Sequence, residues 1–244
     1  MRRVLVVGLI AVLLTACGGD DDADSGGSSS ASGDDAGAAV DVDAEADQAE
    51  ADARVAALVE RLEADGFTEA PDDGEDPPLE FESEECRELE ALFGEDEEID
   101  GSTAEAELPS FERGGDIDGN LVEGGVGFVE EPEQLDVLLD FLRDDTFGQC
   151  MEEGMRLAME DAPEGEPQPE VSGFATEVTE PSEDHVMLTM AATISVEGFS
   201  LDFDFVIDFA RSGRSAAYLL TGSFGAFGEE IDREAYLDVL LGRS

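Results

Sequence analysis

An alternation of apolar and polar side chains between residues 199 and 210 constrains the fold more than any other feature. Its apolar positions are Phe199, Leu201, Phe203, Phe205, Ile207 and Phe209. Asp202, Asp204 and Asp208 lie between them. Successive side chains of a strand point to opposite faces of its sheet, so this pattern predicts a half-buried antiparallel strand with an aromatic inner face and an acidic outer face. Residues 186–196 alternate in the same way, and Glu197-Gly198 suits a tight hairpin between the two strands.

The remaining elements predict an α+β fold. Further strands are expected at residues 105–112, 121–129, 174–180 and 216–224. Helices are expected from Ser83, from Pro132, from a capping-box pattern at Thr146-Phe147-Gly148-Gln149, and over residues 232–241. This order indicates an antiparallel sheet of about five to six strands with helices packed on one face.

The N-terminal third predicts a tether. Residues 17–43 are rich in Gly, Ser, Asp and Ala, a composition that cannot bury enough apolar surface to fold. Residues 44–67 form an Ala-rich helix with Val55, Leu58, Val59 and Leu62 on one narrow stripe, ended by Gly66. This helix is a spacer, a docking helix for the domain, or a weak coiled-coil segment. An acidic Pro-containing linker then spans 68–78, and the folded extracytoplasmic domain spans 79–244.

The first 17 residues resemble a bacterial lipoprotein export signal. Met1-Arg2-Arg3 is followed by an apolar run from Val4 to Leu14, which is shorter than the roughly 20 residues that span a bilayer. Leu14-Thr15-Ala16-Cys17 looks like a lipobox, which implies cleavage after residue 16 and lipidation of Cys17. Two acyl chains give stable anchoring, so the resemblance predicts attachment to the outer face of the cell membrane. The alternative is an ordinary cleaved signal peptide with Cys17 left free.

The other two cysteines, Cys86 and Cys150, predict a disulfide. They remain as an even pair in an oxidising compartment once Cys17 carries lipid. Closing a loop of this length contributes on the order of 4 kcal/mol through chain entropy. The alternative is a reactive thiol at either site, which would need a local excess of positive charge to favour a thiolate, whereas acidic residues predominate around both cysteines.

The net charge of −52 limits the partners. The chain has 64 acidic residues and 12 basic ones, and every basic residue is arginine. Nucleic acid and anionic lipid surfaces would be repelled. Divalent cations, basic peptides and neutral ligands remain compatible, and a solvated acidic surface is the plainest explanation.

The order of elements resembles that of a group of actinobacterial lipoproteins and receptor-kinase sensor domains. These pair an antiparallel sheet with helices and carry a helix cysteine after a strand and an acid-rich loop. The corresponding stretch here runs from Gly127-Phe128-Val129 through Leu138-Leu139 to Gln149-Cys150. The resemblance implies binding of an extracellular ligand or partner.

Catalytic chemistry has little support in the sequence. The only histidine, His185, precedes a predicted strand and is expected to be exposed, and no nucleophile elbow occurs. Without lysine, Schiff-base chemistry is excluded, and no cofactor motif is present. We therefore expect no enzymatic activity, no cofactor and no nucleic-acid partner.

Two features suggest ligands weakly. Asp116, Asp118 and Asn120 resemble the start of a calcium loop, but the closing glutamate of an EF-hand is absent unless Glu123 serves. The methionines form the second feature, as a pliable apolar pocket or as plain core: Met151, Met155, Met159, Met187 and Met190.

These observations predict a lipid-anchored, non-catalytic surface domain that binds a small apolar ligand or an envelope protein. The alternative is a structural envelope protein with an acidic surface that attracts cations, calcium among them.

Salt should stabilise the folded domain without any preference for calcium. Ions screen the repulsion among the carboxylates, so the melting temperature is expected to rise equally in CaCl₂ and NaCl at matched ionic strength. Thermal unfolding followed by circular dichroism measures this. A rise specific to micromolar calcium would instead establish a calcium site.

Overall fold

The computed structural model describes residues 43–71, 81, 83–84, 86–87, 102–115, 118–160, 170–196, 199–225 and 231–243. The predicted signal segment, the lipidation site Cys17 and the candidate ligand Asp116 lie outside the described residues. Within the described part of the chain, no helix has the length and apolar character needed to cross a membrane.

A seven-stranded antiparallel sheet forms the centre of the molecule, in the order β1-β2-β3-β7-β6-β5-β4. The strands are β1 (Thr68–Glu69), β2 (Ser102–Gly115), β3 (Asp118–Val129), β4 (Glu170–Ser182), β5 (His185–Val196), β6 (Phe199–Ser212) and β7 (Ser215–Phe224). The α+β class and the antiparallel sheet are confirmed. The sheet exceeds the expected five to six strands because β1, inside the expected 68–78 linker, pairs with β2.

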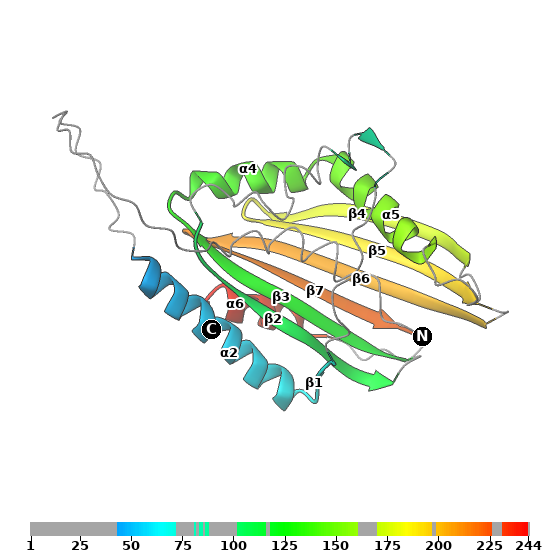
Figure 1. Ribbon diagram of the computed structural model, residues 1–244, viewed down its shortest axis with the longest axis horizontal. Coiled ribbons are helices and arrows are strands. Elements are labelled where there is room, and N and C mark those ends of the chain that lie inside the picture. Colours follow the sequence, from blue (N-terminus) through cyan, green and yellow to red (C-terminus); the bar gives the residue numbers. More distant parts are fainter. Residues whose placement is uncertain are drawn as a thin grey trace, which may run out of the picture.

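Helices cover both faces of the sheet, not one face as the sequence suggested (Figure 1). Helices α4 (Glu133–Leu142) and α5 (Asp145–Glu160) lie on one face. Helices α2 (Ala44–Ala64) and α6 (Arg233–Leu240) lie on the other. The physical reason is visible in the central strand β7, whose run Tyr218-Leu219-Leu220 is entirely buried. Leu219 packs toward α2 and α6, whereas Tyr218 and Leu220 pack toward α4 and α5.

Helix α2 belongs to the folded domain. Ala51, Leu58 and Leu62 are fully buried in the cluster that contains α6 and one face of β2, β3 and β7. Arg214 of the β6–β7 turn donates to both carboxylate oxygens of Asp47, at 2.7 and 3.0 Å. Of the three alternatives for this helix, the docking helix is the one observed, and the domain extends N-terminally beyond its expected start at residue 79.

The predicted disulfide joins Cys86 to Cys150 of α5, with their Cα atoms 5.3 Å apart. Ser83 caps the segment that carries Cys86, as expected, since the Ser83 hydroxyl accepts from the Cys86 amide at 3.3 Å. The start of α5 differs from the prediction. The Asp144 carboxylate accepts from the Thr146 amide at 2.8 Å, so the helix is capped by Asp144, not by the Thr146 box.

Candidate functional site

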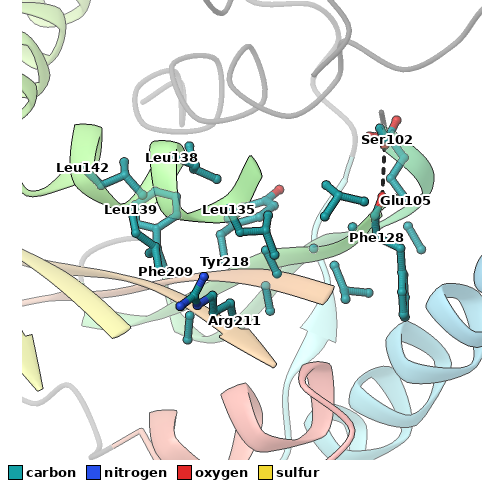
Figure 2. Close-up of a pocket in the computed structure, with 18 of the residues that line it drawn as sticks. Ser102, Glu105, Phe128, Leu135, Leu138, Leu139, Leu142, Phe209, Arg211 and Tyr218 are labelled. Atoms are coloured by element: carbon teal, nitrogen blue, oxygen red, sulfur yellow. Dashed lines mark hydrogen bonds between the residues drawn. The ribbon is translucent and has the colours of Figure 1, made fainter. Parts of the chain in front are cut away.

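A cavity of about 80 Å³ lies between helix α4 and the sheet (Figure 2). Helix α4 presents its apolar stripe to this space through Leu135, Leu138, Leu139 and Leu142. These side chains face Tyr218 and Phe209 across the cavity, and Ser102 and Glu105 lie at one end (Figure 2). The lining is almost entirely apolar and the space is partly open. The site can therefore hold an apolar group with polar groups at its edge.

Two glycines of β3 create this space. Gly125 and Gly127 point toward α4, at positions where any other residue would project a side chain into the cavity. The Tyr218 ring lies over Gly125, because a Cβ built there would be 2.6 Å from Tyr218 Cε1. In the part of the chain that the structure describes, Gly127 is uncovered, since the nearest atom to its Cβ position would be the Ala104 carbonyl oxygen at 3.7 Å. The sequence showed this glycine-rich strand but not which face it would leave empty.

Two glutamates of β2 border the cavity. Glu105 and Glu107 are two residues apart, so both point to the α4 side, whereas Ala104 and Leu108 pack into the opposite core. Burial, and secondarily the charge of Glu107, raises the pKa of Glu105 from 4.5 to about 7. Glu107 is exposed at the rim, and the partial desolvation of its carboxyl raises its pKa as well. Sequence reasoning missed both residues because alternation places them on what resembles an ordinary solvated face.

Tyr218 is the most deeply buried polar group of the cavity wall, with 8% of its surface exposed. Within the described residues, its hydroxyl has no hydrogen-bond partner. Burial raises the pKa of Tyr218, and the carboxylates of Glu107, Glu123 and Glu105 raise it further. A buried tyrosine hydroxyl normally finds a partner. The phenol is therefore available to a ligand.

The arginine that lines the cavity is already neutralised. Arg211 of β6 forms ion pairs with Asp136 of α4 and with Asp184, the latter at 2.6 Å. Along the register, Glu105 pairs with Gly127, Gly127 with Ala216 and Ala216 with Arg211. Three strand spacings, about 14 Å, thus separate the backbones of Glu105 and Arg211.

His185 and Asp208 form a second polar cluster. His185 Nε2 lies 2.8 Å from Asp208 Oδ1, and Arg233 of α6 donates to Asp208 Oδ2 at 2.9 Å. Asp208 is only 3% exposed, so its placement on a solvated acidic face with Asp202 and Asp204 was wrong. His185 is half-buried, not exposed as predicted. In the part of the chain that the structure describes, His185 makes no hydrogen bond to a hydroxyl or thiol, so the cluster joins β5 and β6 to α6.

The sequence-predicted ligand residues lie elsewhere. Asn120 is buried and accepts from Arg113 Nη2 at 3.3 Å, while Asp118 begins β3. Among the residues with described positions, no group of three or more His, Cys, Asp or Glu side chains is arranged to hold a metal ion. Met151 and Met190 are buried core residues of α5 and β5. The side chains of Met155 and Met159 lie outside the described part of the structure, and the described residues that line the cavity include leucines of α4 but no methionine.

No protein-family model matches the chain, and no curated protein sequence matches it. Among solved structures, the extracellular domain of PknH from Mycobacterium tuberculosis is 11% identical, with a TM-score of 0.43 over 78% of this chain and 94% of that chain. LpqN, involved in cell envelope biogenesis of Mycobacterium tuberculosis, is 10% identical, with a TM-score of 0.24 over 75% of this chain and 93% of that chain.

The raised pKa of Glu105 predicts a pH dependence of stability. Between about pH 4.5 and about pH 7 the folded state holds a proton on Glu105 that the unfolded state releases. The free energy of unfolding contributed by this group therefore falls as pH rises through that window and is constant outside it. Glu105→Gln should remove this contribution. In urea unfolding, the free energy of unfolding of the variant should therefore rise relative to that of the wild type between about pH 4.5 and about pH 7.

The matched control is Glu177→Gln, which removes the same charge from an exposed position on β4. A difference between wild type and Glu105→Gln that stays constant across the same pH range would contradict the assignment.

Proposed function

We propose that this chain is a non-catalytic surface lipoprotein domain that binds a small ligand through an apolar group held between α4 and the sheet. The observation that supports this most directly is the partly open apolar cavity with the Tyr218 hydroxyl in its wall, without a partner among the described residues. Such a combination of apolar walls and a few convergent polar groups is typical of ligand sites.

The volume limits what the cavity accepts. Its 80 Å³ is about half of the 150 Å³ void that holds benzene in an engineered core. One short aliphatic chain end therefore fits inside, and the rest of the ligand lies in the open mouth. Each methylene transferred from water contributes about 0.8 kcal/mol to binding.

The proposed location is the outer face of the cell membrane, with a lipidated Cys17 as the anchor. The lipobox-like segment Leu14-Thr15-Ala16-Cys17 supports this placement. The disulfide Cys86–Cys150 supports an oxidising compartment.

A second candidate is a structural envelope protein whose acidic surface attracts cations loosely. The exposed carboxylates of Asp202 and Asp204 on β6 favour it. The two candidates differ in their response to a neutral amphiphile, which an acidic surface would ignore.

Filling the cavity should weaken binding of such an amphiphile. Hexanol is expected to bind the wild type saturably and to shift the amide resonances of β3 and α4. Gly127→Val places two methyl groups where the chain end would lie, without a backbone clash at Cβ. Excluding two or three methylenes weakens binding roughly ten- to fiftyfold at about 0.8 kcal/mol each. Titrations followed by NMR measure both affinities.

Ala175→Val is the control, because it adds methyl groups at an exposed position of β4 away from the cavity. The proposal fails if hexanol does not bind the wild type, or if Gly127→Val binds it as tightly while retaining the wild-type melting temperature.

Loss of the lipid should release the protein from the membrane. Cys17→Ser is expected to move the full-length protein from the membrane pellet to the soluble fraction and to eliminate palmitate labelling, because two acyl chains are needed for stable attachment. Continued sedimentation of Cys17→Ser with membranes would rule out this anchor.

A further inference from the structure

We propose that the ligand of this cavity is an organic cation, an alkylammonium whose chain lies beneath α4 and whose ammonium group is bound by Glu105, Glu107 and the hydroxyl of Tyr218. This inference rests on the proposed ligand-binding function and deepens it by naming the ligand class. Its basis is the position of these three groups relative to one another and the lack of an arginine partner for either glutamate in the described structure.

The sheet register places the three groups on the α4 side of neighbouring strands. Glu107 pairs with Gly125, which pairs with Tyr218, so one strand without a side chain separates the glutamate from the tyrosine. The Tyr218 ring leans across that gap, with its Cε1 over Gly125. Its hydroxyl therefore approaches β2, where Glu105 lies two residues from Glu107 on the same face.

Neither glutamate has a positive partner in the described structure. Arg54, Arg143, Arg211 and Arg214 are examples of arginines that pair with other carboxylates. Glu105 and Glu107 form no ion pair with any arginine that the structure describes. The third nearby carboxylate, Glu123, is buried on the same face of β3 and adds negative potential at Tyr218. Two carboxylates without an arginine partner in the described structure, at the edge of an apolar cavity, favour a positive ligand.

An ammonium group with an apolar chain fits this site better than a metal ion. Among the residues that the structure describes, no group of three or more His, Cys, Asp or Glu side chains is arranged to hold a metal ion. An ammonium has three donors, which match two carboxylates and a phenol oxygen. Hydrogen bonds with ionised partners are roughly twice as strong as neutral ones. The leucines of α4 then bury the chain, which a hydrated metal ion does not offer.

The test compares three probes of equal chain length: hexylammonium, hexanol and hexanoate. Binding to the intact protein is measured by NMR titration at 0.15 M ionic strength, about the physiological value, and at about pH 8, above the pKa of Glu105 of about 7. Hexylammonium is expected to bind about tenfold more tightly than hexanol, a difference of about 1.4 kcal/mol. Hexanoate should bind least.

The double variant Glu105→Gln/Glu107→Gln should lower the affinity for hexylammonium to that for hexanol and leave hexanol binding unchanged. Retained hexanol binding shows that the cavity is still folded. Glu177→Gln removes an exposed charge from β4 and should leave both affinities unchanged, because it alters only the general negative potential. Tyr218→Phe should weaken hexylammonium more than hexanol.

Equal binding of hexanol and hexylammonium to the wild type would overturn the cation inference and leave the apolar-ligand function standing. A loss of hexylammonium binding in Glu177→Gln as large as in the double variant would also overturn it, because the attraction would then be non-specific. Failure of all three probes to bind would overturn both the inference and the proposed function.

Discussion

The burial of strand β7 on both faces is the constraint on which the rest of the structure depends. β7 lies fourth of seven strands, and its run Tyr218-Leu219-Leu220 sends apolar side chains to both sides of the sheet. An antiparallel sheet with one solvated face would leave half of these side chains in water. Helices α2 and α6 therefore cover one face, and α4 and α5 cover the other (Figure 1). This requirement makes α2 part of the domain even though more than 30 residues separate it from β2 in the sequence.

The cavity follows from how this sheet accommodates its aromatic residues. Tyr218 lies over Gly125, and Phe205 lies over Gly222, which is its register partner on β7. Such cross-strand pairs let a large ring cover a backbone that has no side chain of its own. At Gly125 the ring fills the space, whereas no side chain that the structure describes lies over Gly127. The cavity is thus the part of the glycine-rich surface of β3 that no aromatic ring covers.

Charge is distributed differently in the cavity and in the rest of the fold. Asp47 and Asp208 are almost fully buried. Asp47 of α2 bonds to Arg214 in the β6–β7 turn, and Asp208 of β6 bonds to Arg233 of α6. Burying an ionised carboxylate without such a partner carries a large desolvation penalty. Among the described residues Glu105 has no such partner, and burial instead raises its pKa, so that the carboxyl group stays protonated to a higher pH. The cavity glutamates are therefore the place where a positive ligand gains most from its charge.

The sequence by itself determined the α+β class, the long antiparallel strands, the Cys86–Cys150 pair and the helix end at Gly66. Each follows from local periodicity, backbone conformation or cysteine number, which do not depend on distant contacts. Only the tertiary structure decided which face each residue occupies. Asp208 and Glu105 both alternate as solvated strand residues, yet α6 buries the first and the α4 side of the sheet partly buries the second. The cavity requires α4, β2, β3 and β7 together, and no local pattern specifies how four separate segments leave a space between them.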